Sequence, residues 1–148
     1  MTPRLISLWI VWMFLVAPGT AIAALQEDVT AIRTILLEAR GEGLNGMIAV
    51  GEVIRNRAKA RHQTFSEVCL APLQFSAWNA PRAAKHALAG ISGEEYQRAA
   101  KAWALSEHTN LVNGADHYCT FAVNPFWCKA KNPVAVIGAH RFFDLRKV

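Results

Sequence analysis

Apolar side chains recur at helical spacing through the first two thirds of the sequence. This periodicity predicts helices over residues 27–39, 45–61 and 94–108. Two shorter helices are expected over residues 64–68 and 82–88. Thr64 with Glu67, and Ser92 with Glu95, are spaced as capping boxes, which mark the beginnings of two of these helices. Residues 73–79 are predicted to form an irregular, aromatic-rich loop.

The pattern changes after Asn113-Gly114, a dipeptide typical of turns. From there, short apolar runs are separated by turn residues, and the sequence predicts strands over residues 117–121, 134–137 and 140–143. Helices therefore come first and a small antiparallel sheet comes last. The predicted fold class is α+β: a mostly helical domain with a small C-terminal antiparallel β-sheet.

The N-terminal residues have the layout of a secretory signal. Arg4 precedes the run Leu5–Ala17, whose only polar residue is Ser7, and small residues follow at Ala21-Ile22-Ala23. We expect a signal peptide over residues 1–23 and a single catalytic domain over residues 24–148. The alternative is an uncleaved membrane anchor, but as a helix the run spans only about 20 Å of a bilayer core of roughly 30 Å. We therefore expect no stable membrane span after cleavage, and a protein exported to the periplasm, cell wall or medium.

Composition adds little to this picture. The chain has 148 residues, enough for one domain, and a formal net charge of +5. A modest positive charge suits an anionic partner such as a cell-wall polymer, and on charge alone it suits nucleic acid equally well. The export signal argues against nucleic acid.

The sequence contains three cysteines, Cys69, Cys119 and Cys128. An odd number in an exported protein leaves at least one cysteine unpaired or bonded between chains. Cys119 and Cys128 lie close in sequence, on either side of the turn-like Asn124-Pro125. We predict a disulfide between Cys119 and Cys128, with Cys69 as a buried thiol.

Two carboxylates, Glu38 and Glu42, stand four residues apart at the end of the first predicted helix, beside two glycines. A helix C-terminus disfavours an anion, and an apolar wall would add to this effect, so we expect Glu38 to retain a proton near neutral pH. A glycosidase acid needs this property. Glu42 is a candidate second carboxylate, but the glycines leave its spacing from Glu38 open. Glu52 is expected to be a half-buried structural carboxylate that faces Arg55 or Arg57.

The loop over residues 73–79 combines amides with flat rings. Sugar sites use both groups, because rings stack on pyranose faces and amides bind hydroxyl and N-acetyl groups. The candidates are Gln74, Phe75, Ser76, Trp78 and Asn79. Phe75 and Trp78 could equally be core anchors.

A second set of residues, His117, Cys119, Cys128 and His140 with Asp116, could be interpreted as a metal cluster. Their spacing does not fit a zinc finger and export favours a disulfide, so we expect no metal and no cofactor. A hydrolase with a cysteine nucleophile and a histidine base is a further alternative. A histidine on an alternating strand, such as His140, is by default a hydrogen-bonded core residue.

Four separated motifs resemble the SleB-type cell-wall hydrolases, the family of the spore-cortex-lytic enzymes. In order, they are Glu38-Ala39-Arg40-Gly41-Glu42 with Val50-Gly51-Glu52-Val53-Ile54-Arg55-Asn56-Arg57, Gln74-Phe75-Ser76-x-Trp78, Gly114-Ala115-x-His117-Tyr118 with Pro125-x-Trp127, and Ile137-Gly138-x-His140-x-Phe142-Phe143. The resemblance extends from about Ile35 to Phe143.

This resemblance implies a lysozyme-like, mostly helical catalytic domain. It implies cleavage of peptidoglycan glycan strands between N-acetylmuramic acid and N-acetylglucosamine, commonly as a lytic transglycosylase. Glu38 would be the catalytic acid, protonating the glycosidic oxygen and then acting as base on the muramoyl 6-hydroxyl. One carboxylate suffices for this reaction, so Glu42 is not needed as a nucleophile. The candidates for lining the substrate cleft are Gln74, Ser76, Tyr118 and His140.

The chain departs from the family pattern at three positions. Many relatives have Cys at the position of Ala77 and a second His at the position of Cys119, so Cys69 lacks its family partner and Cys128 would supply a replacement crosslink to Cys119. Phe143 stands where the last motif usually ends in Tyr.

The rival functions are a hydrolytic N-acetylmuramidase and a non-catalytic wall-binding module on the same fold. Wall binding would use the cleft alone or a targeting partner protein.

Overall fold

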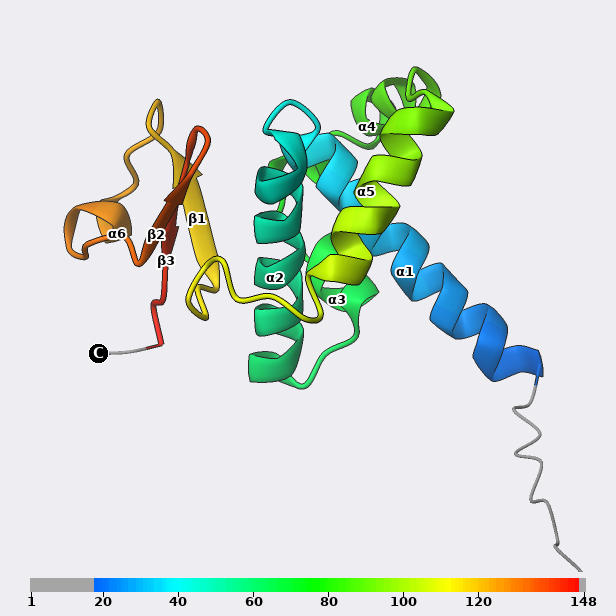
Figure 1. The fold of residues 1–148 in the computed structure, drawn as a ribbon, viewed down its shortest axis with the longest axis horizontal. Helices are drawn as coiled ribbons and strands as arrows, with labels where there is room; N and C mark the ends of the chain where they lie inside the picture. Colours follow the sequence, from blue (N-terminus) through cyan, green and yellow to red (C-terminus); the bar gives the residue numbers. More distant parts are fainter. Residues whose placement is uncertain (1–17, 147–148) are drawn as a thin grey trace, which may run out of the picture.

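The computed structural model describes residues 18–146, and the apolar run expected to belong to the signal peptide lies outside these residues. Helices dominate the described chain, and a small sheet follows them (Figure 1). No helix in this part of the chain has both the length and the hydropathy of a membrane span.

The predicted helices and strands occur in the predicted order. The elements are α1 (Pro18–Ala39), α2 (Gly43–Arg61), α3 (Phe65–Leu70), the 3-10 helix η1 (Ser76–Asn79), α4 (Pro81–Ala89), α5 (Gly93–Leu105), β1 (His117–Thr120), α6 (Phe126–Lys129), β2 (Ala135–Ile137) and β3 (His140–Phe143). Two short helices, α6 and η1, the latter within the loop expected over residues 73–79, were not predicted. The strands form one antiparallel sheet in the order β1-β3-β2. The predicted α+β class is confirmed.

Local sequence explains where two of the helices begin. Both predicted capping boxes are present, at Thr64 and Glu67 for α3 and at Ser92 and Glu95 for α5. In contrast, α1 begins at Pro18, well before the expected start. Its first turns extend away from the other elements in Figure 1, and the chain is exposed over residues 19–26.

Helix α2 lies between two layers of structure. Figure 1 shows α1, α3, α4 and α5 on one side of it, and the sheet with α6 on the other. Met47 and Ile54 of α2 belong to the helical core, which also contains Ile35 and Leu36 of α1. Ala49 and Val53 of the same helix, with Phe142 and other buried residues, form the core that joins α2 to the sheet. Because both sides of α2 are covered, it is buried along most of its length, as expected for a central helix.

Each face of the sheet has a different neighbour. Tyr118 pairs with Phe142 and Thr120 with His140, and because side chains alternate along a strand, these four lie on one face. This is the face that packs against α2. The opposite face carries Cys119, which clusters with residues of α6. The sheet thus separates the α2 core from a second, smaller core.

Glu52 is buried more completely than predicted, and it does not bind an arginine. Only 3% of the residue is exposed. Its carboxylate accepts the backbone N–H groups of Leu111 and Val112, both at 2.9 Å. These bonds fix the segment that leads from α5 to β1. The expected structural role is therefore right, but the predicted partners, Arg55 or Arg57, are wrong.

We predict that Glu52→Ala lowers the free energy of unfolding by about 2–4 kcal/mol, because two buried donors lose their acceptor. Urea denaturation monitored by circular dichroism measures this change. The control is Glu107→Ala, whose side chain is 62% exposed and only 3.9 Å from Arg55; it should change stability by less than about 0.5 kcal/mol. Equal effects of the two substitutions would contradict the assigned role of Glu52.

Candidate active site

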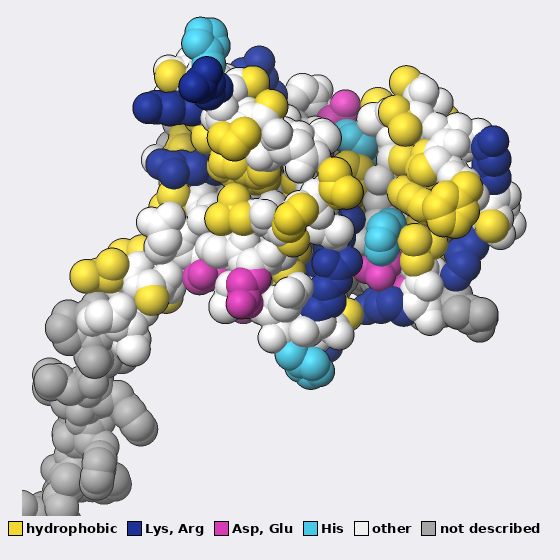
Figure 2. Space-filling model, turned by 180° about the vertical axis from the view of Figure 1, so that it is seen from behind, with side chains coloured by type: hydrophobic (Ala, Val, Ile, Leu, Met, Phe, Trp, Pro, Cys, Tyr) yellow, Lys and Arg dark blue, Asp and Glu magenta, His cyan; other side chains and the backbone are white. Residues whose placement is uncertain are grey.

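A cleft of about 520 Å³ lies where α1, η1 and the sheet meet. Figure 2 shows this side of the molecule, where a furrow separates the helical part from the C-terminal part. The lining residues are Leu37, Glu38, Arg57, Leu73, Gln74, Ser76, Asn79, Tyr118, Cys119, Thr120, Val123, Pro125, Trp127 and His140. The cleft therefore brings together all five of the predicted site residues, Glu38, Gln74, Ser76, Tyr118 and His140.

Glu38 is half-buried in the last turn of α1 and accepts three hydrogen bonds. The backbone N–H of Ala77 donates to Oε1 at 3.2 Å, and the Ser76 hydroxyl reaches the same oxygen at 3.5 Å. The Tyr118 hydroxyl donates to Oε2 at 2.9 Å. Residues of η1 therefore hold Oε1, and a residue of β1 holds Oε2.

Tyr118 reaches Glu38 from the first strand of the sheet. Its ring packs edge-on against His140, with ring centroids 5.1 Å apart, and tilted against Phe142 at 5.7 Å. Burial, and after it the negative charge of Glu38, raises the pKa of the Tyr118 phenol well above its ordinary value. The phenol consequently stays protonated at neutral pH and remains able to donate a hydrogen bond.

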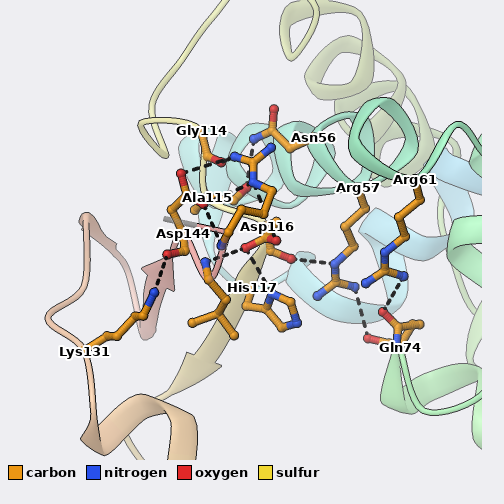
Figure 3. Close-up of polar contacts among 12 residues, drawn as sticks. Asn56, Arg57, Arg61, Gln74, Gly114, Ala115, Asp116, His117, Lys131 and Asp144 are labelled. Carbon is orange, nitrogen blue, oxygen red and sulfur yellow. Dashed lines mark hydrogen bonds and ion pairs between the residues drawn. The ribbon is translucent and has the colours of Figure 1, made fainter. Parts of the chain in front are cut away.

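The other predicted lining residues differ in what they contact. Gln74 is held by two arginines: its side-chain oxygen accepts from Arg61 at 3.0 Å, and its backbone carbonyl accepts from Arg57 at 3.4 Å (Figure 3). His140 is only 5% exposed. Its Nδ1 has no hydrogen-bond partner and lies 3.9 Å from a carboxylate oxygen of Glu42.

Two polar side chains of α2 hold the beginning of β1 in place. Asn56 donates to the carbonyl of Ala115 at 2.8 Å, and Arg57 donates to the carbonyl of Asp116 at 2.6 Å (Figure 3). Burial lowers the pKa of Arg57, while its guanidinium also lies 4.9 Å from the centre of the Phe75 ring. Arg57 belongs to the C-terminal half of α2. Its role as the link between α2, the loop and the sheet depends on tertiary contacts.

Glu42 does not line the cleft; it is the N-cap residue of α2, and its side chain binds the turn between β2 and β3. Its Oε2 accepts the backbone N–H of Ala139 at 2.8 Å. Gly138 has a φ of 56°, and a Cβ at this position would collide with the Glu42 carboxylate. The side chain of Glu42 therefore supports this turn, and whether it takes part in catalysis stays a matter for the variant described below.

Asp116 lies in a network of hydrogen bonds and ion pairs beside the cleft. Its Oδ1 accepts the backbone N–H of Leu145 at 3.0 Å and lies 3.0 Å from Nδ1 of His117. Arg146 approaches its other oxygen at 3.7 Å. These contacts explain the buried carboxylate without a metal ion. Among the described residues, no group of three or more potential ligands is arranged to hold one.

The three cysteines are free thiols in this structure, and all are buried. Cys119 and Cys128 belong to the same small core, and their side chains are hydrogen-bonded to each other. Burial, followed by this contact, raises the pKa of Cys128 to about 12. Burial also raises the pKa of Cys69 to about 11, and the Cys69 thiol hydrogen-bonds to Thr34.

Leu73, a cleft residue that the sequence did not single out, has an unusual backbone. The Gln74 N–H bonds to the carbonyl of Ala71, so residues 71–74 form a turn with Pro72 and Leu73 at its centre. Leu73 has a φ of 63°, a conformation that favours glycine, and its side chain is 84% exposed. An exposed apolar side chain in a strained turn therefore borders the cleft.

The family is established by comparison with known proteins. A family model described as cell wall hydrolase matches residues 41–143, most of the chain. The chain therefore belongs to the cell wall hydrolases, and it is an enzyme that acts on peptidoglycan. The matched segment begins after Glu38, so it is the geometry described above that shows this residue to line the cleft. No curated protein matches the sequence.

Two solved structures resemble the chain and confirm the resemblance to SleB. The catalytic domain of the Bacillus cereus SleB protein is 25% identical with a TM-score of 0.63, covering 79% of this chain and 89% of that one. The catalytic domain of the germination-specific lytic transglycosylase SleB from Bacillus anthracis is also 25% identical, with a TM-score of 0.62 and coverage of 79% and 93%.

We predict that Tyr118→Phe lowers wall-cleaving activity at least about tenfold, because the Glu38 carboxyl group loses the hydrogen bond that holds its Oε2 in the cleft. The assay is release of soluble fragments from purified sacculi. Thr109→Val is the control, because it removes an exposed hydroxyl that donates to the carbonyl of Leu105 at 3.0 Å and lines neither this cleft nor its neighbour. Undiminished activity of the Tyr118 variant, with an unchanged unfolding transition, would contradict the role of the hydroxyl.

We further predict that oxidation joins Cys119 to Cys128, whose side chains are already in contact. Thiol counting under denaturing, non-reducing conditions should find one free cysteine per chain, and peptide mapping after alkylation should identify it as Cys69. Three free thiols in the oxidised protein would refute the crosslink.

Proposed function

We propose that this enzyme cleaves peptidoglycan glycan strands between N-acetylmuramic acid and N-acetylglucosamine as a lytic transglycosylase, with Glu38 as its single catalytic acid. The observation that carries the proposal is the composition of the cleft: among its described lining residues, Glu38 is the only carboxylate. Glycosidases that hydrolyse with water usually need a pair of carboxylates. A cleft with one carboxylate fits better a reaction in which a hydroxyl group of the substrate itself is the nucleophile.

The reaction begins with transfer of a proton from Glu38 to the glycosidic oxygen. The bond from that oxygen to C1 of the muramoyl residue breaks, and positive charge develops on the sugar ring. The ionised Glu38 then removes the proton from the muramoyl 6-hydroxyl, whose oxygen attacks C1 to form the 1,6-anhydro ring. Glu38 regains its proton, no water is consumed, and one carboxylate serves as acid and then as base.

The hydrogen bonds of Glu38 favour Oε2 as the oxygen that carries the proton. The backbone N–H of Ala77 can only donate, so it keeps Oε1 an acceptor. The hydroxyl of Tyr118 can donate or accept, so it can stay bonded to Oε2 in either protonation state. Tyr118 therefore orients the carboxyl group through both steps.

The remaining predicted residues are assigned to substrate binding. Ser76 lies against the reacting carboxylate, and Gln74 and His140 line the same cleft. Trp127, which also lines the cleft, adds an aromatic face of the kind on which a sugar ring stacks. His140 packs against Tyr118 and therefore also positions its ring.

The enzyme is proposed to act after export, once residues 1–23 have been removed. Two observations support this boundary. Ile22 and Leu25 are 68% and 65% exposed, so the first turns of α1 contribute little to the core. The buried residues of α1 begin at Thr30, well beyond the expected cleavage position before Ala24.

We predict that the wild-type enzyme releases fragments ending in 1,6-anhydro-muramic acid from purified sacculi, and that Glu38→Gln abolishes their release. Glutamine keeps the acceptor oxygen for Ala77 but cannot transfer the proton. Mass spectrometry of the soluble products measures both results. Glu42→Gln is the matched control, because Glu42 lies outside the cleft; it should retain the product pattern.

The products also separate the competing functions. Reducing muramic acid ends alone would identify a hydrolytic muramidase and overturn the transglycosylase mechanism. Activity that survives Glu38→Gln would remove Glu38 as the acid. Binding to sacculi without release of any fragment by the wild type would indicate a non-catalytic module.

A further inference from the structure

A second cavity, of about 700 Å³, lies next to the Glu38 cleft. The 3-10 helix η1 contributes to both: Ser76 and Asn79 line the cleft, and Trp78 lines the second cavity. Helix α1 also contributes to both, with Glu38 in the cleft and Arg33 in the second cavity. The two cavities are therefore neighbours that share the same two elements as walls.

The second cavity combines an apolar wall with two cations. Trp78, Leu88 and Tyr96 belong to the wall, while Arg33 and Lys85 bring positive charge from α1 and α4. Figure 2 shows this side of the helical part, where exposed hydrophobic side chains lie beside Lys and Arg side chains. The indole N–H of Trp78 donates to Thr34 at 2.9 Å, so its ring is fixed in the wall.

The two cations have no acidic partner among the described residues. None of the ion pairs found there involves Arg33 or Lys85. The nearest acidic residues in sequence to the cavity wall are Glu94 and Glu95 of α5. The Glu95 carboxylate already accepts the backbone N–H of Ser92 at 2.9 Å, in the capping box. The cavity therefore presents uncompensated positive charge beside apolar surface.

We propose that this cavity binds the anionic peptide stem of the peptidoglycan strand whose glycan occupies the Glu38 cleft, an inference that rests on the proposed function. A stem peptide begins at the lactyl group of muramic acid and combines alanine methyl groups with free carboxylates. Its apolar groups match the wall that contains Trp78 and Tyr96, and its carboxylates match Arg33 and Lys85.

The distances allow one strand to occupy both cavities. Leu37 lines the cleft and Arg33 lines the second cavity, and because they stand four positions apart on α1 they are neighbours on one face of the helix, with Cβ atoms about 5–6 Å apart. Three residues of extended peptide span about 10 Å. A stem attached to a muramoyl residue in the cleft is therefore long enough to extend past Leu37 to Arg33.

Titration with a soluble stem peptide tests this inference without relying on catalysis. The probe is the tripeptide L-Ala-γ-D-Glu-meso-diaminopimelate, added to the 15N-labelled protein at millimolar concentration. The indole N–H resonance of Trp78, in the second cavity, should shift, while that of Trp127, in the Glu38 cleft, should not. A shift at Trp127 alone, or at neither indole, overturns the proposal.

Charge recognition is tested with a matched pair of variants. Arg33→Ala with Lys85→Ala should weaken tripeptide binding at least about fivefold. The control combines Arg82→Ala with Lys101→Ala, which removes the same charge from exposed positions outside the cavity and should change affinity less than twofold. The same tripeptide with amidated carboxylates should bind the wild type as weakly as the tripeptide binds the Arg33/Lys85 variant. Equal binding of the charged and amidated peptides rejects the inference.

A cleavage assay separates failure of this inference from failure of the proposed function. Stem-bearing strands and strands whose stems have been removed by an amidase are each offered to the wild type and the Arg33/Lys85 variant. The variant should lose activity only on stem-bearing strands. Equal activity of both proteins on both substrates overturns the stem site and leaves the glycan function standing. No cleavage of either substrate by the wild type overturns the glycan function, while the titration still decides the stem site.

Discussion

The position of the sheet depends on two side chains of α2, Asn56 and Arg57, which bind the backbone carbonyls just before β1. Because these two carbonyls are held by α2, β1 has a fixed position relative to that helix. This position determines which side chain of β1 reaches α1. Arg57 is only 4% exposed, so loss of its partners would leave a buried cation, at a large cost in stability. The bond from Tyr118 to Glu38, which joins residues 80 positions apart, depends on this attachment.

The elements that the sequence predicted well are those whose structure is encoded locally. The two capping boxes, and the spacing of apolar residues in α2 and α5, involve residues close together in the sequence. They can therefore be recognised before the fold is known. Helix α6 was missed because its four residues are too few to show a period. The early start of α1 was missed because its exposed first turns show no periodic spacing of apolar residues. Glu52 was assigned arginine partners because its actual partners are backbone N–H groups of a loop that is distant in sequence.

The site was predictable to the extent that it lies in short motifs. Glu38, Ser76 and Tyr118 each stand in a motif that resembles the family, and the structure brings the three side chains into contact. A motif in the sequence does not show how its side chains contact those of another motif. The unpartnered cations of the second cavity and the strained turn at Leu73 come from packing and backbone geometry, neither of which leaves a pattern in one sequence. The resemblance also could not show that Glu42 supports a hairpin turn.

A mechanism with one carboxylate places a stricter demand on the surroundings than one with two. The same carboxyl group must donate a proton and then accept one from a different atom, so it has to stay in place while its charge changes. The backbone N–H of Ala77 donates a hydrogen bond to one oxygen in both states. The hydroxyl of Tyr118, which can donate or accept, stays hydrogen-bonded to the other oxygen. One contact comes from η1 and one from the sheet, so both layers around α2 are needed to hold Glu38. This requirement gives the attachment of β1 to Asn56 and Arg57 its functional meaning: moving the sheet would free one oxygen of the proposed catalytic acid.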